Sequence, residues 1–123
     1  MGKVIILALI LVLTGSGCLF VDPLTRAQNL SQKGKFDEAI KVLEKDLISS
    51  PNSVPVKSIL AQMYSNYGQA LCQDQNKPPK VKYPMAKEQF AMALALNPDL
   101  KEAKEMYEMI ERIQALFAAK KID

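Results

Sequence analysis

Histidine is absent from this 123-residue sequence. Its absence excludes a histidine general base and histidine metal ligands, the commonest solutions for both roles. The five glycines do not gather into a phosphate-binding loop, and Cys18 and Cys72 lie too far apart for a Cys-X-X-Cys motif. Ser49 and Ser50 consequently have no histidine to activate a hydroxyl nucleophile. We expect no enzymatic activity, no cofactor and no metal site.

A large excess of one charge is also absent, because the 16 basic residues are opposed by 13 acidic ones and the net charge is +3. A nucleic-acid-binding domain usually carries a clustered basic patch. Here basic and acidic residues are interspersed along the chain, which is typical of solvated helix surfaces. We therefore expect no nucleic-acid partner.

The first 17 residues have the pattern of a secretory signal peptide. Lys3 precedes an apolar run from Val4 to Leu13, and small residues follow before Cys18. A run of about ten apolar residues is short for a membrane-spanning helix, which needs about 20. Extension through the glycines to Val21 gives a longer segment, so a retained anchor is the alternative to cleavage.

The segment TGSGC, residues 14–18, resembles the lipobox of bacterial lipoproteins. The resemblance implies cleavage before Cys18, acylation of Cys18 and a tether over residues 18–23, although Gly15 stands where leucine is usual. It also implies a lipid-anchored protein of the cell envelope. Leu19 replaces the aspartate that retains lipoproteins at the inner membrane, which favours the outer membrane. Without acylation, Cys18 is an incidental apolar residue, and the protein is secreted or lies at the cell surface.

Acylation of Cys18 would leave Cys72 without a disulfide partner in the same chain. An unpaired cysteine beside Leu71 in a helical segment is typical of a small buried apolar residue. A disulfide between two molecules and a reactive thiol are the alternatives.

The rest of the chain contains an internal repeat. The segment FDEAIKVLEKDLISSPN, which ends at Asn52, returns as YPMAKEQFAMALALNPD, which ends at Asp99, with an offset of 47 positions. The segment before it recurs with an offset of 34, since Ala27 corresponds to Ala61 and Gly34 to Gly68. An offset of 34 is the tetratricopeptide period. The larger offset indicates an insertion within the second repeat.

These residues resemble the tetratricopeptide repeat, and the resemblance implies an all-α solenoid of two helical hairpins over residues 24–119. Apolar spacing and helix-ending residues predict helices over about 24–33, 37–49, 54–72, 84–96 and 99–120. Pro78 and Pro79 predict that the insertion is a loop, residues 74–83. Asp99 and Glu102 predict a capping box for a C-terminal capping helix. The resemblance also implies close helix crossings at small residues, which are Ala27, Ala39, Ala61, Gly68, Ala86 and Ala93.

Binding residues follow from the same resemblance, because the first helix of each repeat lines the inner groove of the solenoid. The candidates are polar and neutral, and they are Gln28, Ser31, Gln32, Ser58, Gln62, Ser65 and Asn66. Their side chains could hydrogen-bond an extended peptide, and a merely solvated face is the alternative. The last helix carries more apolar residues than a cap needs, which makes a second contact surface of Met109, Ile113, Leu116 and Phe117. Burial against the preceding hairpin is the alternative for these four.

Two functions agree with this organisation. The first is a lipid-anchored, non-enzymatic adaptor or assembly factor that binds another envelope protein or its peptide segment. The second is a self-assembling subunit, because two repeats are fewer than the roughly three that a solenoid usually needs, and stacking on another copy would complete the core. The partners implied are thus an envelope protein, the membrane through Cys18, and further copies of the chain.

Overall fold

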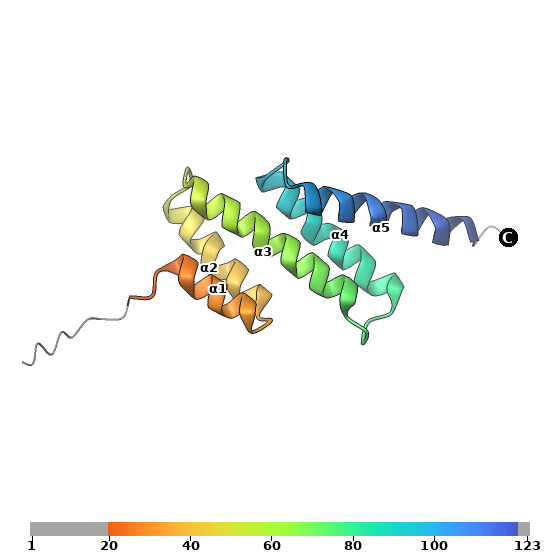
Figure 1. Cartoon of the computed structure of the whole chain (residues 1–123), viewed down its shortest axis with the longest axis horizontal. Helices are drawn as coiled ribbons and strands as arrows, with labels where there is room; N and C mark the ends of the chain where they lie inside the picture. The colour runs from red at the N-terminus through yellow and green to blue at the C-terminus, as the bar shows by residue number, and fades with distance from the viewer. Residues whose placement is uncertain (1–19, 121–123) are drawn as a thin grey trace, which may run out of the picture.

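The computed structural model describes residues 20–120, and this part of the chain contains helices and no strand (Figure 1). The expected all-α class is therefore confirmed for the described residues. The signal peptide, Cys18 and the start of the tether lie outside them. None of the described helices is long and apolar enough to span a membrane. The five helices are α1 (Pro23–Gln32), α2 (Phe36–Ser49), α3 (Val54–Gln73), α4 (Pro79–Leu96) and α5 (Lys101–Lys120).

The helices follow one another as antiparallel neighbours, and each packs against the next (Figure 1). The central helix is α3, which has α1 and α2 on one side and α4 on the other. The final helix α5 packs on α4 and diverges from it toward the C-terminus. The chain therefore forms a row of helices whose first and last members lie at opposite ends.

Side-chain caps and one glycine define the ends of the first helices. Asp22 accepts hydrogen bonds from the backbone N–H groups of Leu24 (2.9 Å) and Thr25 (3.1 Å), so it caps α1, and Pro23 follows at a position that needs no N–H. Gly34 has a φ of 74° in the turn to α2, which is a conformation that residues with a Cβ adopt only at a cost.

Small residues occupy the centre of the core, as the sequence predicts. Ala27, Ala39, Ala61, Ala86 and Ala93 are all fully buried. At Gly68 an added Cβ would lie only 2.8 Å from the ring of Phe90, which is itself fully buried. The absence of a side chain at Gly68 thus lets α3 and α4 approach closely.

The prediction of an inserted loop over residues 74–83 is wrong for its second half. Helix α4 begins at Pro79, and the backbone N–H groups of Val81 and Lys82 already donate to the carbonyl oxygen of Pro78. Proline is compatible with the first turn of a helix, where its missing N–H leaves no bond unmade. Pro84 then lies inside α4 instead of in its first turn. The insertion therefore lengthens the second hairpin, since α3 has 20 residues and α4 has 18, compared with 10 and 14 in α1 and α2.

The predicted capping box of Asp99 and Glu102 is also absent. Helix α5 begins at Lys101, and Glu102 Oε1 accepts a hydrogen bond from Gln69 Nε2 on α3 at 2.8 Å. The turn before α5 is held by Asn97, whose Oδ1 accepts from the backbone N–H of Asp99 at 3.1 Å. A tertiary partner has replaced the local one that the spacing indicated.

Candidate binding surfaces

The predicted polar groove residues lie on α1 and α3, and most of them are accessible. Gln28, Gln32 and Ser58 are exposed, and Ser31 is half-buried. Gln62 and Asn66 bond to each other, because Gln62 Nε2 donates to Asn66 Oδ1 at 2.9 Å. Each of these two amides retains further donors and acceptors for a ligand.

Ser65 is a correction to the predicted groove. Its side chain is fully buried, and its Oγ has no hydrogen-bond partner in the described part of the chain. It therefore cannot contact a ligand in an exposed groove. The physical reason is that α3 is covered by neighbours on more than one face, so that Met63, Tyr64 and Ser65 are buried in succession. A single helical stripe cannot indicate such coverage.

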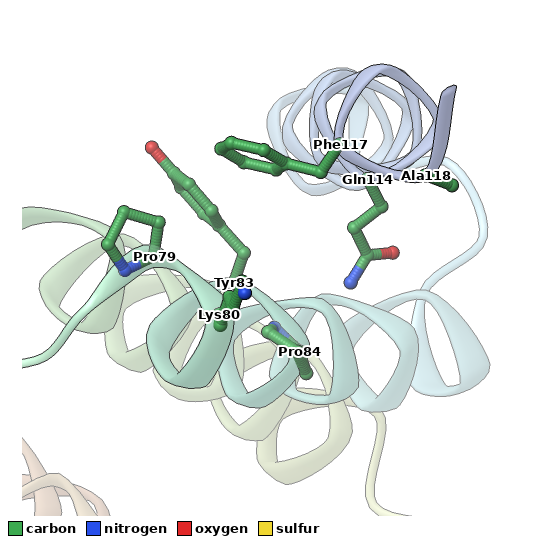
Figure 2. A pocket seen from close by; sticks show the side chains of 7 residues that line it. All are labelled: Pro79, Lys80, Tyr83, Pro84, Gln114, Phe117 and Ala118. Atoms are coloured by element: carbon green, nitrogen blue, oxygen red, sulfur yellow. The ribbon is translucent and has the colours of Figure 1, made fainter. Parts of the chain in front are cut away.

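The four predicted contact residues of α5 divide into two environments. Met109 and Ile113 are half-buried, whereas Leu116 is 67% exposed and Phe117 is 44% exposed. Of these four, Phe117 lines a cleft between α4 and α5. Its ring lies across from Tyr83, which projects from the first turns of α4 (Figure 2).

The cavity is a cleft of about 310 Å³ between the start of α4 and the end of α5, and we call it the end cleft (Figure 2). It forms because the two helices separate beyond their last close contacts. These last contacts include the buried Ile110 of α5 and an ion pair between Lys87 of α4 and Glu111 of α5 at 3.1 Å. The Lys87 ammonium also lies 4.9 Å from the ring centre of Tyr107. The residues that line the end cleft are Pro79, Lys80, Tyr83, Pro84, Gln114, Phe117 and Ala118.

The chemistry of the end cleft is that of binding. Its surface comes mainly from two aromatic rings and two prolines, and Lys80 and Gln114 supply the polar groups. Apolar walls with a few polar groups are typical of a pocket that binds an apolar group and orients it. The described residues contain no cluster of groups that could hold a metal ion. The sequence did not bring Tyr83 and Pro84 together with Phe117, because residues 74–83 were expected to form a loop and the next helix was expected to begin at Pro84.

Two of the three lysines near the start of α4 already have partners. Lys77 Nζ pairs with Asp74 Oδ2 at 2.5 Å, and Lys82 Nζ donates to the backbone oxygen of Asp74 at 3.4 Å. The bonds from Lys77 and from the Asn76 N–H lower the pKa of the Asp74 carboxyl. Lys80 is the member of this group that lines the end cleft, so it is the one available to a ligand there.

Cys72 is half-buried on α3 and forms no disulfide within residues 20–120. Burial raises the pKa of its thiol, and Lys82 offsets this only in part. The neutral thiol is a poor nucleophile. Cys72 therefore contributes to packing.

No family model, no curated protein and no solved structure matches this chain. The residues and their geometry must therefore carry any proposal about function.

Proposed function

We propose that this protein is a lipid-anchored, non-enzymatic adaptor or assembly factor of the bacterial envelope. Its domain would be a tetratricopeptide-like solenoid that holds a segment of another envelope protein in the end cleft. The observation that carries the proposal is the end cleft itself, an open apolar pocket between two aromatic rings at one end of a row of helices (Figure 2).

Packing supports the solenoid part of the proposal. Helices α1 and α2 form one antiparallel hairpin, α3 and α4 form a second, and α5 packs on the second hairpin. The fully buried Ala27 and Ala39 in the first hairpin recur as Ala61 and Ala86 in the second. Solenoids repeat one such unit, and terminal elements close the two ends.

The proposed anchor and the end cleft suit one another in position. The described chain begins at Phe20, two residues after Cys18, and the end cleft lies at the opposite end of the row (Figure 1). A lipid on Cys18 would tether the first hairpin beside the membrane. The end cleft would then remain accessible to a partner.

The occupant that fits is a protein segment that inserts one aromatic or long aliphatic side chain between Tyr83 and Phe117. Burial of such a side chain contributes about 1.5–3 kcal/mol. Gln114 and Lys80 line the same cleft and can bond the carbonyl or carboxylate groups of the segment. One apolar anchor with a few polar contacts is typical of an interaction hot spot.

The alternative of end-to-end stacking has less support. Stacking needs an apolar surface on the first hairpin that would cover α5 of the next copy. The exposed residues of α1 and its C-cap are instead polar, and they are Thr25, Arg26, Gln28, Asn29, Gln32 and Lys33. The exposed apolar residues of the first hairpin lie elsewhere, at Phe20 and Val21 before α1 and at Ile48 on α2. A polar outer face is what a terminal capping element of a solenoid requires. The first helix thus favours a closed end and an adaptor.

Photo-crosslinking in native membranes tests the adaptor. A crosslinker in place of Gln114 would lie in the end cleft, and one in place of the exposed Asn29 on α1 serves as the control. We expect a distinct envelope protein to be crosslinked from position 114 and not from position 29, and Phe117→Ala to abolish the product. The neighbouring Leu116→Ala should leave it, since Leu116 does not line the cleft. A product that persists in Phe117→Ala would contradict the proposal.

The anchor is tested separately by intact-mass measurement of the mature protein. We expect the wild-type mass to show diacylglycerol or further acyl chains on Cys18, and Cys18→Ser to lack them. An unacylated Cys18 in the mature wild type would refute the lipid anchor and leave the end cleft as a separate question.

A further inference from the structure

We call the surface of α3 that lies between α2 and α4 the furrow. Both helices pack on α3, and its floor comes from an α3 stripe that includes Leu60, Tyr64, Tyr67 and Leu71. Two hollows lie along it, one of about 460 Å³ between the starts of α2 and α4 and one of about 470 Å³ between their ends. Leu60 and Tyr64 are each two positions from Gln62, so the furrow lies on the other side of α3 from the polar pair Gln62 and Asn66.

The walls of the second hollow are apolar and accessible. Leu47 and Ile48 come from α2, and Met92 and Leu96 come from α4. Ile48 is 80% exposed and Met92 is 43% exposed, so large side chains lie in solvent at both rims. A solvated surface helix usually has a charged outer face.

The same unusual exposure continues along the outer side of α4. Val81, Met85 and Met92 recur at helical spacing and are all exposed to solvent. Met85 also lines the first hollow of the furrow. Methionines on an exposed face are frequent where a surface accommodates a partner helix.

The α2 wall carries a fixed pattern of charge. Asp37, Lys41 and Glu44 lie at positions i, i+4 and i+7, hence on one face of the helix. The furrow floor holds both carboxylates, because the Tyr67 hydroxyl donates to Asp37 Oδ2 (3.5 Å) and the Tyr64 hydroxyl donates to Glu44 Oε1 (2.5 Å). A carboxylate that accepts one hydrogen bond has further lone pairs for a cationic partner.

We infer that the furrow binds an amphipathic helix of another protein, whose apolar stripe fills the hollows. The carboxylates of Asp37 and Glu44 are seven residues apart, about 10.5 Å along a helix. A complementary helix therefore carries two basic residues seven positions apart, with an acidic residue between them opposite Lys41. Helix binding in an apolar groove is an established mode of recognition.

Charge excludes a second copy as the fitting occupant. In the described helices, α4 has basic residues seven positions apart at Lys80 and Lys87, with Tyr83 and Pro84 where an acidic residue is required. Lys87 is moreover already paired with Glu111. The carboxylates on the α2 wall likewise disfavour an anionic lipid surface, and Lys77, which lines the first hollow, is already paired with Asp74. The furrow is thus an interaction surface separate from the end cleft, and it does not depend on the proposed function.

The test measures fluorescence anisotropy of labelled helical peptides with the full-length protein in detergent micelles. The reference peptide has a leucine stripe, two lysines seven positions apart and a glutamate between them. A reversed peptide exchanges each lysine for glutamate and the glutamate for lysine. Ile48→Asp and Glu44→Gln alter exposed residues of the furrow. Glu108→Gln, at an exposed glutamate of α5, is the matched control.

We expect saturable binding of the reference peptide to the wild type. Ile48→Asp should weaken it at least about tenfold through the loss of apolar contact. Glu44→Gln keeps an acceptor for Tyr64 but loses the charge, and it should weaken binding about fivefold, the upper range for an accessible ion pair. Glu108→Gln should bind like the wild type, and Glu44→Lys should narrow the preference for the reference peptide over the reversed peptide, because one of the three charge pairs changes sign.

Three results would overturn the inference. The first is a failure of either peptide comparison. In that case the reference and reversed peptides bind equally, or Ile48→Asp leaves the affinity for the reference peptide unchanged. The second is self-association of the protein that Ile48→Asp abolishes, which would assign the furrow to a second copy. The third is retention on vesicles of phosphatidylglycerol that depends on Ile48 and resists competition by the peptide, which would assign it to the membrane.

Discussion

Gly68 of α3 lies directly against the ring of Phe90 on α4. An added Cβ at Gly68 would lie 2.8 Å from Phe90 Cζ, 2.9 Å from Cε1 and 3.0 Å from Cε2. Carbon atoms in favourable contact are about 3.5–4.0 Å apart. The ring is fully buried and has little room to turn away. We therefore predict that Gly68→Ala destabilises the fold although alanine favours helix.

The magnitude follows from two opposing effects. Overpacking of a buried site costs about 1–3 kcal/mol, and contact with three ring atoms places this substitution near about 3 kcal/mol. Alanine in place of glycine gains about 1 kcal/mol of helix propensity. The net loss is about 2 kcal/mol, which lowers Tm by about 10 °C for a domain of this size.

Urea denaturation of the full-length protein in a mild detergent, followed by far-UV circular dichroism, measures this loss. A double-mutant cycle with Phe90→Leu isolates the contact, because the smaller side chain removes the opposing ring atoms. We expect a favourable coupling of up to about 3 kcal/mol between the two substitutions, the full cost of the contact. Gly34→Ala is the control, since a Cβ at Gly34 meets nothing within 4 Å and its cost of about 1 kcal/mol comes from the φ of 74° alone. The reasoning is refuted if Gly68→Ala is as stable as the wild type, or if Phe90→Leu leaves its cost unchanged.

Three further predictions concern buried polar groups. Ser65→Ala should stabilise the fold by about 1 kcal/mol, because it removes a buried hydroxyl without a partner, and a loss of stability in urea would contradict this. Burial, and then the bond to Glu44, raise the pKa of Tyr64 above its ordinary value of 10.0. Above pH 10 the unfolded chain loses this proton before the folded protein does, so the free energy of unfolding falls as pH rises. Tyr64→Phe should reduce the slope of free energy against pH by up to about 1.4 kcal/mol per pH unit. An unchanged slope would contradict this prediction. Cys72 should react with iodoacetamide at least about tenfold more slowly in the folded protein than in urea, since burial raises its pKa, and site-resolved mass spectrometry would reveal equal rates if this is wrong.

The helices were predictable from the sequence where local signals decided them. Apolar spacing and terminating residues predicted the existence of all five helices. The resemblance to the tetratricopeptide repeat implied close crossings at Ala27, Ala39 and Ala93, and these three residues are buried. The predicted ends of α2 and α4 and the predicted start of α3 agree with the structure, and each lies within two residues of a proline, whereas the predicted start of α4 does not agree. Pro79 acted as a helix start although the adjacent prolines indicated a loop, because the choice depends on whether a first turn can form behind Pro78.

The candidate sites were less predictable, since each depends on what lies across from a residue. The sequence singled out Phe117, and the structure supplied Tyr83 as its neighbour by letting α5 diverge from α4. The sequence also placed Ser65 in an exposed groove, although neighbours on more than one side of α3 bury this residue. The furrow between α2 and α4 was missed altogether, because it lies between helices that are separated in the chain by α3.

The sequence by itself determined an all-helical chain with a repeated pattern of small and large apolar residues, because helix periodicity and capping act over a few neighbouring residues. The tertiary structure alone decided which helical faces are covered and which remain open. Coverage depends on the angle and distance between helices, and these are set by contacts such as that of Gly68 with Phe90, whose partners are distant in the sequence. The end cleft and the furrow exist for that reason.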